Sequence, residues 1–363
     1  MSSKVLYIGN YRDASGWGAA CVNNILAMST AGIDVVPRAI SFEAQDSEYP
    51  DRIKQLELQS SYDCDVCVQH TLPHLYSYNA NYKNVGFMAV ESASFRSTGW
   101  VESANLMDEI WVPSLASKGQ CRLSGITVPI KVVPHSLDIS SYVNYKPQVG
   151  IRDIVGGFNF IFIGEFIERK NLKALVKAFH AEFHMDENVN LVIKTSKIDP
   201  KELEQYCGQI KKGLKIRKDY KKEVILCGRL KYDMYLSVIK QCHSFVMPSR
   251  GEAFCIPALE AMACGVPAIW TAETGVDDFG YGESVDSREE PCFGAVDTIP
   301  YLDGYSAYWR EIDARKLQVA MRGAFMKWQN HKHSDLSREA IEKARQYDHK
   351  VIGNKIKEIL NDS

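Results

Sequence analysis

Residues 244–270 read SFVMPSRGEAFCIPALEAMACGVPAIW, and their pattern predicts a strand, a helix and a second strand. The apolar runs at residues 244–248 and 266–270 are each long enough for one buried strand. Pro257 suits the first turn of the intervening helix, where its missing N–H costs nothing, and Gly265 suits a left-handed cap at its end. Strand, helix and strand in this length form a βαβ unit with parallel strands and a right-handed crossover.

Two glutamates of this stretch lie where a ligand is expected. Ligands of open α/β sheets bind at the carboxyl ends of the strands. Glu252 lies in the loop at that edge, and Glu260, one turn into the helix, can face the same side. A plain buried βαβ unit with two solvated glutamates is the structural alternative, but such a unit needs no acid in the loop before Pro257. The pattern therefore favours a binding site.

The same stretch resembles the signature of retaining glycosyltransferases of the two-Rossmann GT-B type, family GT4. That signature has two glutamates separated by seven residues, embedded in E-x-F-G-[LI]-P-x-x-E-A-x-A-x-G-x-P. The matching residues are Glu252, Phe254, Pro257, Glu260, Ala261, Ala263, Gly265 and Pro267. Cys255 departs from the signature, because the family usually has glycine there, and its Cβ and thiol would crowd a donor sugar.

The resemblance implies an α/β protein of the GT-B fold, with two Rossmann-like, doubly wound domains that face an interdomain cleft. The chain has 363 residues, which is enough for two domains of ordinary size. We expect an acceptor-side domain over residues 1–140, a linker over 141–157 and a nucleotide-sugar-binding domain over 158–335. Residues 336–363 suit the final helix that crosses back to the first domain in GT-B proteins.

Apolar runs and turn residues predict the remaining elements. Strands are expected at residues 5–8, 33–40, 65–69, 84–90, 109–112, 130–134, 158–164, 189–194 and 224–226. Helices are expected at residues 16–30, 101–108, 113–125, 314–329 and 336–360, with another ending near residue 183. Residues 139–157 suggest an irregular linker and residues 274–303 a loop-rich surface.

Glycines and cations at two strand-to-helix junctions predict an anion site. Backbone N–H groups at such a turn can approach a phosphate, and the helix dipole favours the negative charge. Gly16, Trp17 and Gly18 open one helix, and the family's corresponding glycine-rich loop lies under the donor diphosphate; a tight turn is the structural alternative. Arg169 and Lys170 lie at a second junction and resemble the family's diphosphate-binding pair.

The resemblance also implies roles for the other residues of the donor site. Arg169 and Lys170 would stabilise the charge that grows on the leaving diphosphate, which takes over a metal's task. Glu252 would hold hydroxyls of the donor sugar, and we count it with the two cations as catalytic, while Glu260 would hold the ribose. The remaining expected donor contacts are Arg229, at the strand end where the family lodges the nucleobase, and Ala253, Phe254, Cys255 and Ile256.

No metal and no other cofactor is expected. Asp63-Cys64-Asp65 resembles the D-x-D metal motif of the other glycosyltransferase fold, GT-A, but there the carboxylates end a strand and here they precede one. Cys64 and Cys67 are three apart and should lie on opposite faces of the strand.

Histidines and lysines elsewhere give no further site. His180 and His184 lie four apart on a helix without an evident third ligand, which favours a structural role. The basic run at residues 211–222 suggests a solvated face.

The acceptor is less well defined by the sequence. His70 and Glu91 each end a predicted strand and could face an acceptor, although single residues at such positions are often structural. Residues 1–150 contain 11 Lys+Arg and 14 Asp+Glu, a poor match to a polyanion. A sugar, a small molecule or a protein is therefore favoured, and a DNA base, as in phage-type enzymes, stays open because a local basic cleft can coexist with that total.

Composition fits an ordinary cytoplasmic enzyme. Formal net charge is −2, the 10 cysteines are scattered in apolar runs, and no run approaches the ~20 apolar residues of a membrane span. The beginning of the chain shows no signal-peptide pattern. We expect transfer of a sugar from a nucleotide-diphosphate sugar to an acceptor, with retention. The alternatives are a nucleotide-sugar 2-epimerase or hydrolase of the same fold, and a nucleotide-sugar-binding protein without turnover.

Overall fold

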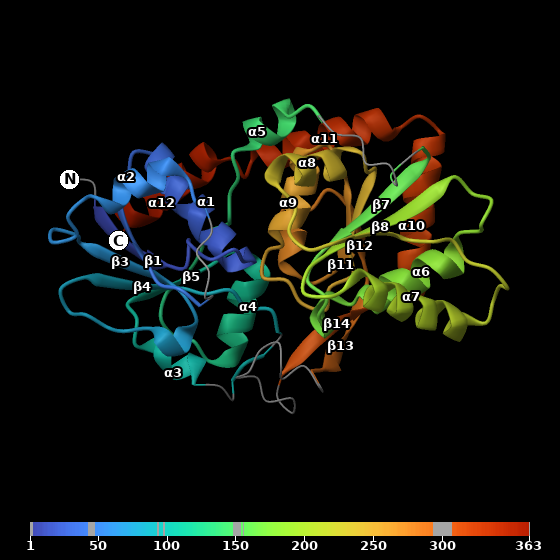
Figure 1. The fold of residues 1–363 in the computed structure, drawn as a ribbon. Coiled ribbons are helices and arrows are strands. Elements are labelled where there is room, and N and C mark those ends of the chain that lie inside the picture. The colour runs from blue at the N-terminus through green and yellow to red at the C-terminus, as the bar shows by residue number, and fades with distance from the viewer. Residues whose placement is uncertain are drawn as a thin grey trace. The chain divides into compact units, whose positions relative to one another are not determined.

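The computed structural model describes residues 3–42, 48–92, 94–96, 99–147, 154, 156–292 and 307–362 (Figure 1). Its chain contacts group into two compact units. Unit 1 comprises Met1–Ile139, Pro300–Tyr308 and Gln346–Ser363, and unit 2 comprises Ser140–Ile299 and Trp309–Arg345. Each unit is built around its own six-stranded sheet of parallel strands, so the chain has the α/β architecture expected from the sequence.

Unit 1 has the strand order β2-β1-β3-β4-β5-β6. Its strands are β1 (Lys4–Gly9), β2 (Asp34–Ala39), β3 (Val66–His70), β4 (Lys83–Phe87), β5 (Glu109–Val112) and β6 (Ile130–Val132). Its helices are α1 (Gly16–Thr30), α2 (Asp51–Glu57), η1 (Pro73–Leu75), α3 (Trp100–Asn105), α4 (Leu115–Ser124) and α12 (His349–Asn361). Figure 1 shows α3 and α4 on the side of the sheet opposite α1.

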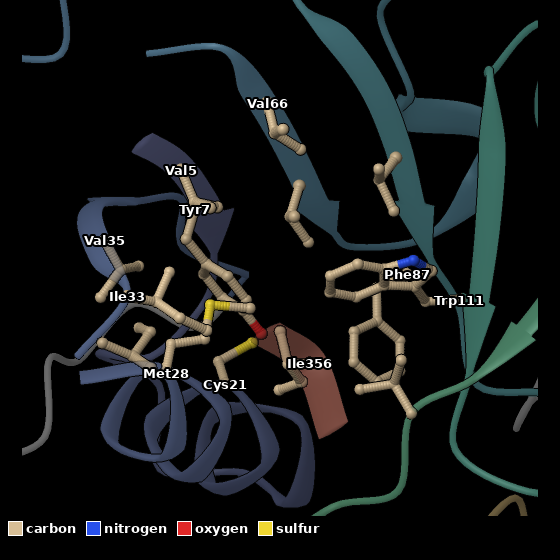
Figure 2. Packing of buried hydrophobic residues seen from close by; sticks show 14 of the residues in the cluster. Val5, Tyr7, Cys21, Met28, Ile33, Val35, Val66, Phe87, Trp111 and Ile356 are labelled. Carbon is tan, nitrogen blue, oxygen red and sulfur yellow. The ribbon is translucent and has the colours of Figure 1, made fainter. Parts of the chain in front are cut away.

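The main core of unit 1 lies between its sheet and α1, α2 and α12. Figure 2 shows Tyr7 and Phe87 from the strands beside Cys21 of α1 and Ile356 of α12, all fully buried. The last helix therefore supplies part of this core although it is far from it in sequence. Helices cover both faces of the sheet, which explains why its central strands are near-continuous apolar runs rather than alternating ones.

Unit 2 has the strand order β12-β11-β10-β7-β8-β9. Its strands are β7 (Phe158–Ile163), β8 (Val189–Thr195), β9 (Val224–Cys227), β10 (Ser244–Met247), β11 (Ala268–Thr271) and β12 (Gly282–Val285), with a separate pair β13 (Ser287–Pro291) and β14 (Tyr308–Ile312) at its edge. Its helices are η2 (Glu168–Lys170), α6 (Leu172–Glu182), α7 (Pro200–Leu214), α8 (Tyr232–Lys240), α9 (Ile256–Ala263), η3 (Gly275–Asp278), α10 (Ala314–Gln329) and α11 (His333–Arg345), and α5 (Ile139–Asn144) begins at the boundary between the units.

The predicted βαβ unit of residues 244–270 is confirmed. Strands β10 and β11 are parallel and joined by α9, with Pro257 in the first turn. Gly265 follows the helix at a φ of 81°, in the left-handed region that the sequence required. The backbone conformation therefore favours glycine, and a Cβ at this position would also displace Ser337 Oγ of α11, which lies 2.2 Å from it.

Several predicted boundaries are wrong. Strand β4 ends at Phe87 rather than at residue 90, because the Val90 carbonyl accepts a hydrogen bond from Ser117 Oγ instead of extending the sheet. Residues 139–144 of the expected irregular linker form the helix α5, while residues 148–153 and 155 lie outside the described residues. The expected loop-rich surface contains β12 and β13, and its residues 293–303 are outside the described part.

Two side-chain placements also differ from the sequence reasoning. Cys64 and Cys67 pack into one apolar cluster rather than on opposite faces, because Cys64 lies in the turn before β3 and not in the extended strand. The basic run is only partly solvated. Lys211 pairs with the buried Glu223 at 2.7 Å, and Arg217 donates to the His180 carbonyl at 2.9 Å at the end of α6.

Candidate functional site

The two loops that carry the predicted catalytic residues leave neighbouring strands of unit 2. Strands β7 and β10 pair in parallel, but the chain continues from β7 toward β8 and β9, and from β10 toward β11 and β12. The loops after these strands therefore diverge at the carboxyl edge of the sheet. Such a topological switch point is where open α/β sheets bind their ligands.

Local sequence fixes both loops. After β7 the chain makes the short 3₁₀ helix η2, and Asn171 at a φ of 51° turns it into α6. After β10 the loop ends at Cys255, whose φ of 76° lies in the left-handed region. A non-glycine residue in that region is strained, which gives a physical reason for the glycine that the GT4 signature has at this position.

The three predicted catalytic residues meet at this switch point. Lys170 Nζ donates to Glu252 Oε1 at 2.6 Å, and Arg169 Nη1 lies 3.5 Å from the same oxygen. Arg169 also donates to the Gly251 carbonyl at 2.6 Å, which fixes the guanidinium against the loop. The side chains of Lys170 and Glu252 are only 13% and 5% exposed, so this is a desolvated charge cluster rather than a surface ion pair.

Electrostatics keep Glu252 ionised in this cluster. Burial by itself would raise the pKa of the carboxyl, but the charges of Lys170 and Arg169 outweigh it and lower the pKa below its ordinary value. Two cations and one carboxylate leave one net positive charge at the edge of the sheet. The cluster can therefore accept an anion, and Glu252 would share Lys170 with that anion.

Glu260 points to a different set of partners. Its Oε1 accepts from the Tyr142 hydroxyl of α5 at 2.9 Å, and its Oε2 accepts from the Tyr235 hydroxyl of α8. Burial raises the pKa of Glu260, and the two phenolic hydrogen bonds oppose that rise. The carboxylate is half-buried and retains lone pairs that could accept from a vicinal diol.

Four of the remaining predicted donor contacts, residues 253–256, directly follow Glu252 in the chain. Ala253, Phe254 and Cys255 are buried, and Phe254 stacks on Phe279 with ring centroids 4.5 Å apart. The Gly275 amide donates to the Glu252 carbonyl at 2.8 Å. A Cβ at Gly275 would lie 2.0 Å from the Ala253 carbonyl oxygen, so this glycine permits the close approach of the loops after β10 and β11. Ile256 begins α9 and is half-buried, and Arg229 is exposed after β9.

The glycine-rich turn of unit 1 is organised by its own cap. Ser15 Oγ accepts the Gly18 amide at 3.1 Å and caps α1. A Cβ at Gly18 would lie 2.0 Å from the Asp13 carbonyl oxygen, whereas one at Gly16 would meet nothing within 4 Å. Packing therefore explains Gly18, and its amide already has a partner. The role of Gly16, Trp17 and Gly18 under a diphosphate stays a prediction.

The two residues proposed for the acceptor differ in accessibility. His70 ends β3 and is fully buried; its Nδ1 and the Tyr7 hydroxyl are 2.5 Å apart, and its ring stacks on Phe87 at 4.2 Å. Burial lowers the pKa of His70 well below its ordinary value, so the imidazole is neutral. Glu91 does not end β4, as the sequence suggested, but lies four residues beyond it and is half-buried. Acceptor contact by either residue stays a prediction.

The residues that raised the question of a metal are engaged in structural contacts. Asp63 pairs with Lys4 at 2.6 Å, and Asp65 accepts the Lys4 amide at 3.1 Å. His180 Nε2 lies 2.5 Å from Glu223 Oε1, while His184 is exposed and 3.2 Å from Asp186. Within the described parts of the chain, no group of three or more His, Cys, Asp or Glu side chains could hold a metal ion.

The chain resembles known proteins in both sequence and fold. Residues 154–279 match the family "Glycosyl transferases group 1". An uncharacterised glycosyltransferase of Methanocaldococcus jannaschii is 29% identical over 140 residues, which are 38% of this chain and 36% of that protein. The match thus spans about a third of that relative's length. HepE of Anabaena, solved in complex with UDP and glucose, superposes with a TM-score of 0.69 at 14% identity, covering 99% of this chain and 100% of that one.

This chain has the GT-B fold of these solved structures. Sucrose-phosphate synthase of Thermosynechococcus elongatus superposes with a TM-score of 0.63 at 14% identity and covers 99% of this chain and 98% of that one. The family match covers β7 through η3 and therefore includes both loops of the switch point. Among the helices that the structure describes in this GT-B protein, none has the length and apolarity needed to cross a membrane.

Sequence reasoning missed the residues that hold the predicted ones in place. Tyr142 and Tyr235 reach Glu260 from positions 118 and 25 residues away, and no local pattern marks either of them. Ser249 and Arg250 lie in the loop just before the signature, which begins at Glu252, and no residue of the signature matches them. The sequence signal for these two residues is their position beside Gly251 and Glu252, in a loop at the carboxyl end of a strand.

Proposed function

We propose that this GT-B protein transfers a glycosyl group from a nucleotide-diphosphate sugar to an acceptor, with retention and without a metal ion. The observation that carries the proposal is the meeting of Arg169, Lys170 and Glu252 at the topological switch point of unit 2. A strand-end site with a net positive charge, beside the start of α9, suits a diphosphate better than a neutral ligand.

Each charged residue has a role in that reaction. As the glycosidic bond breaks, negative charge grows on the leaving diphosphate, and Lys170 with Arg169 stabilises it. Glu252 exchanges part of its contact with Lys170 for hydroxyl groups of the donor sugar. In a retaining transfer of this type the acceptor attacks from the face that the diphosphate leaves, so the leaving group itself is the nearest base for the acceptor proton. We assign no general base among the side chains.

The nucleotide end of the donor would lie toward Glu260. A carboxylate that is held by two phenols is oriented before the ligand arrives, and it can accept both ribose hydroxyls. Arg229, which follows β9, would contact the nucleobase. Uridine diphosphate is the first nucleotide to test, because HepE has been solved with UDP and with UDP-glucose.

The acceptor stays open in this proposal. The negative balance of residues 1–150 favours a sugar, a small molecule or a protein over a polyanion, and a DNA base is retained as an alternative. A buried His70 would have to become accessible before it could touch any of these.

Two other functions use the same site. A 2-epimerase or hydrolase would need the same diphosphate contacts but would release or rearrange the sugar without an added acceptor. A binding protein without turnover would need no cluster in which two buried cations meet one carboxylate, and that cluster favours an enzyme.

The test is a thermal-shift screen of nucleotides and nucleotide sugars, followed by product analysis. A ligand that binds only the folded state raises the melting temperature by mass action. We expect a nucleoside diphosphate and its sugar conjugate to raise it, and Lys170→Ala to remove the shift or to abolish turnover. No shift with any nucleoside diphosphate would contradict the proposal. Proton NMR of the products separates transfer from epimerisation and hydrolysis.

A further inference from the structure

Arg250 joins three segments of unit 2 at the switch point. Its Nη1 donates to the Glu168 carbonyl at 2.7 Å and to Glu168 Oε1 at 2.5 Å, both in η2. Its Nε donates to Glu311 of β14, and its guanidinium lies 5.1 Å from the ring centroid of Trp309 on the same strand. One side chain thus binds the loop after β7 and the strand β14 while it belongs to the loop after β10.

The backbone around Arg250 repeats this connection. The Arg250 amide donates to the Arg169 carbonyl at 2.7 Å, and the Arg250 carbonyl accepts from the Arg310 amide at 2.7 Å. Ser249 Oγ donates to the same Arg169 carbonyl at 3.1 Å. The positions of Arg169 and Lys170 relative to Glu252 are therefore set by bonds that pass through residue 250 as well as by the direct ion pair.

The anchor on β14 is itself tied to the loop after β7. Glu311 Oε2 accepts from Arg250 Nε, and its Oε1 accepts from Asn171 Nδ2 at 3.2 Å. The Arg250 side chain is 12% exposed and Glu311 is 20% exposed, so solvent screens this pair only weakly. A planar guanidinium with donors in a fixed fork suits three fixed acceptors, and a lysine ammonium would not reproduce that geometry.

We propose that Arg250 is a positioning residue for glycosyl transfer. It holds Arg169 and Lys170 in place relative to Glu252, and Glu311 anchors it on β14. The inference rests on the proposed function. Within the described residues, the hydrogen bonds of the Arg250 side chain go to η2 and β14, so we do not count it as a catalytic residue. A displacement of about 1 Å at the reacting groups typically costs on the order of a hundredfold in rate. If Arg169 and Lys170 shift relative to Glu252, kcat should therefore fall.

A matched ion cluster in the same unit provides the control. Arg322 of α10 donates to Glu182 Oε1 at 2.8 Å, pairs with Glu187 and lies 4.4 Å from the ring centroid of Phe183. Like Arg250 it contacts two carboxylates, and it lies over two aromatic rings, Phe183 and Phe325, where Arg250 has one. It joins α10 to the end of α6 and makes no described hydrogen bond or ion pair with the predicted donor-site residues.

The experiment measures kcat, KM for the donor and melting temperature for Arg250→Met, Arg250→Lys, Glu311→Gln and Arg322→Met. All kinetics are run well below the melting temperature of the least stable variant. Arg250→Met should lower kcat by roughly a hundredfold with a smaller change in KM. Arg250→Lys should recover only part of the loss, and Glu311→Gln should shift kcat in the same direction. Arg322→Met should lower the melting temperature while kcat and KM stay at wild-type values.

The outcomes separate this inference from the proposed function. If the wild-type protein neither binds nor turns over a nucleotide sugar, the proposed function fails. If the wild type is active, and Arg250→Met folds and has the wild-type kcat and KM, the positioning role is overturned. Arg250 then contributes only to the stability of the fold. If Arg250→Met does not fold, Glu311→Gln decides the question, since a wild-type kcat in that variant overturns the anchor.

Discussion

At the scale of single residues, the contact between Glu252 and Lys170 predicts the direction in which UDP affinity changes when Glu252 loses its charge. Glu252→Gln removes the negative charge that competes with a diphosphate for Lys170, 2.6 Å away. We therefore expect UDP to bind a few-fold more tightly to this variant, while turnover falls by on the order of a hundredfold because donor-sugar contacts are lost. Calorimetry gives the affinity, and donor consumption gives the rate.

The control for this variant is Glu223→Gln in the same unit. Glu223 is a buried glutamate that pairs with Lys211 at 2.7 Å, away from the switch point. Its substitution should change stability but leave UDP affinity at the wild-type value. Weaker UDP binding by Glu252→Gln would mean that Glu252 supports the diphosphate site rather than competing with the ligand for Lys170.

Glu260 makes a prediction about pH. Burial raises its pKa and the hydrogen bonds from Tyr235 and Tyr142 oppose the rise, so Tyr235→Phe should raise the pKa further. Ribose hydroxyls donate to the ionised carboxylate, so UDP affinity should fall as pH drops through this pKa. In Tyr235→Phe the fall should begin at a higher pH than in the wild type.

Calorimetry with UDP between pH 4.5 and 8 tests this, with Tyr145→Phe as the control. The Tyr145 hydroxyl bonds Ser237 Oγ at 3.0 Å and the Asp233 carbonyl, and it makes no hydrogen bond to Glu260. Identical pH midpoints in the wild type and both variants would show that Glu260 does not contact the nucleotide. Titration of UDP itself affects all three proteins equally and cancels in the comparison.

What the sequence could predict at this scale depends on distance along the chain. Glu252, Phe254 and Glu260 lie within one short motif, and Arg169 and Lys170 mark a strand-to-helix junction, so local patterns were enough to make them candidates. Tyr142 and Arg250 act through partners brought together only by the folded sheet. A short pattern cannot predict those contacts.

At the scale of elements, substitution by alanine should have opposite effects at two glycines of unit 2, one directly after a helix and one inside a helix. Gly265 caps α9 at a φ of 81°, where a Cβ would strain the backbone and meet Ser337 Oγ at 2.2 Å. Gly265→Ala should therefore lower the free energy of unfolding by about 1–2 kcal/mol or more. Gly323 lies inside α10 with nothing within 4 Å of its Cβ position, so Gly323→Ala should raise it by about 0.5–1 kcal/mol.

Thermal or urea melts of both variants check this pair. A stabilised Gly265→Ala would mean that α9 ends differently from the cap described above. A destabilised Gly323→Ala would mean that, in solution, other atoms occupy the space that this Cβ would need.

A cavity of about 470 Å³ has Gly323 in its wall. It lies at the edge of the sheet opposite the switch point, and none of the predicted site residues lines it.

Local periodicity predicted the buried elements and missed those set by long-range contacts. Residues 336–360 have a continuous helical pattern, but the chain forms α11 and α12 with a break between them. At the break Leu137 donates its amide to the Tyr347 carbonyl and accepts the His349 amide, and Asp348 caps α12. Strand β12 is polar and mostly exposed at the edge of its sheet, so it has no apolar run by which to be found.

At the scale of the whole molecule, the sequence pattern accounts for two sheets, each built of six parallel strands. Apolar runs alternate with amphipathic helices, and such an alternation produces a doubly wound fold. Grouping of contacts assigns α11 to unit 2 and α12 to unit 1. The expected linker and final segment were each treated as one piece, whereas the chain builds α5 from the first and two helices from the second.

The central claim is that Arg169 and Lys170 replace a metal in the departure of a nucleoside diphosphate. It is tested most directly by proton NMR of donor turnover in EDTA, with the nucleotide sugar that gives the largest thermal shift. The account predicts full turnover in EDTA, a first-formed product with the anomeric configuration of the donor, and a loss of roughly a hundredfold or more in Lys170→Ala. Loss of turnover in EDTA that Mn²⁺ restores would contradict the claim.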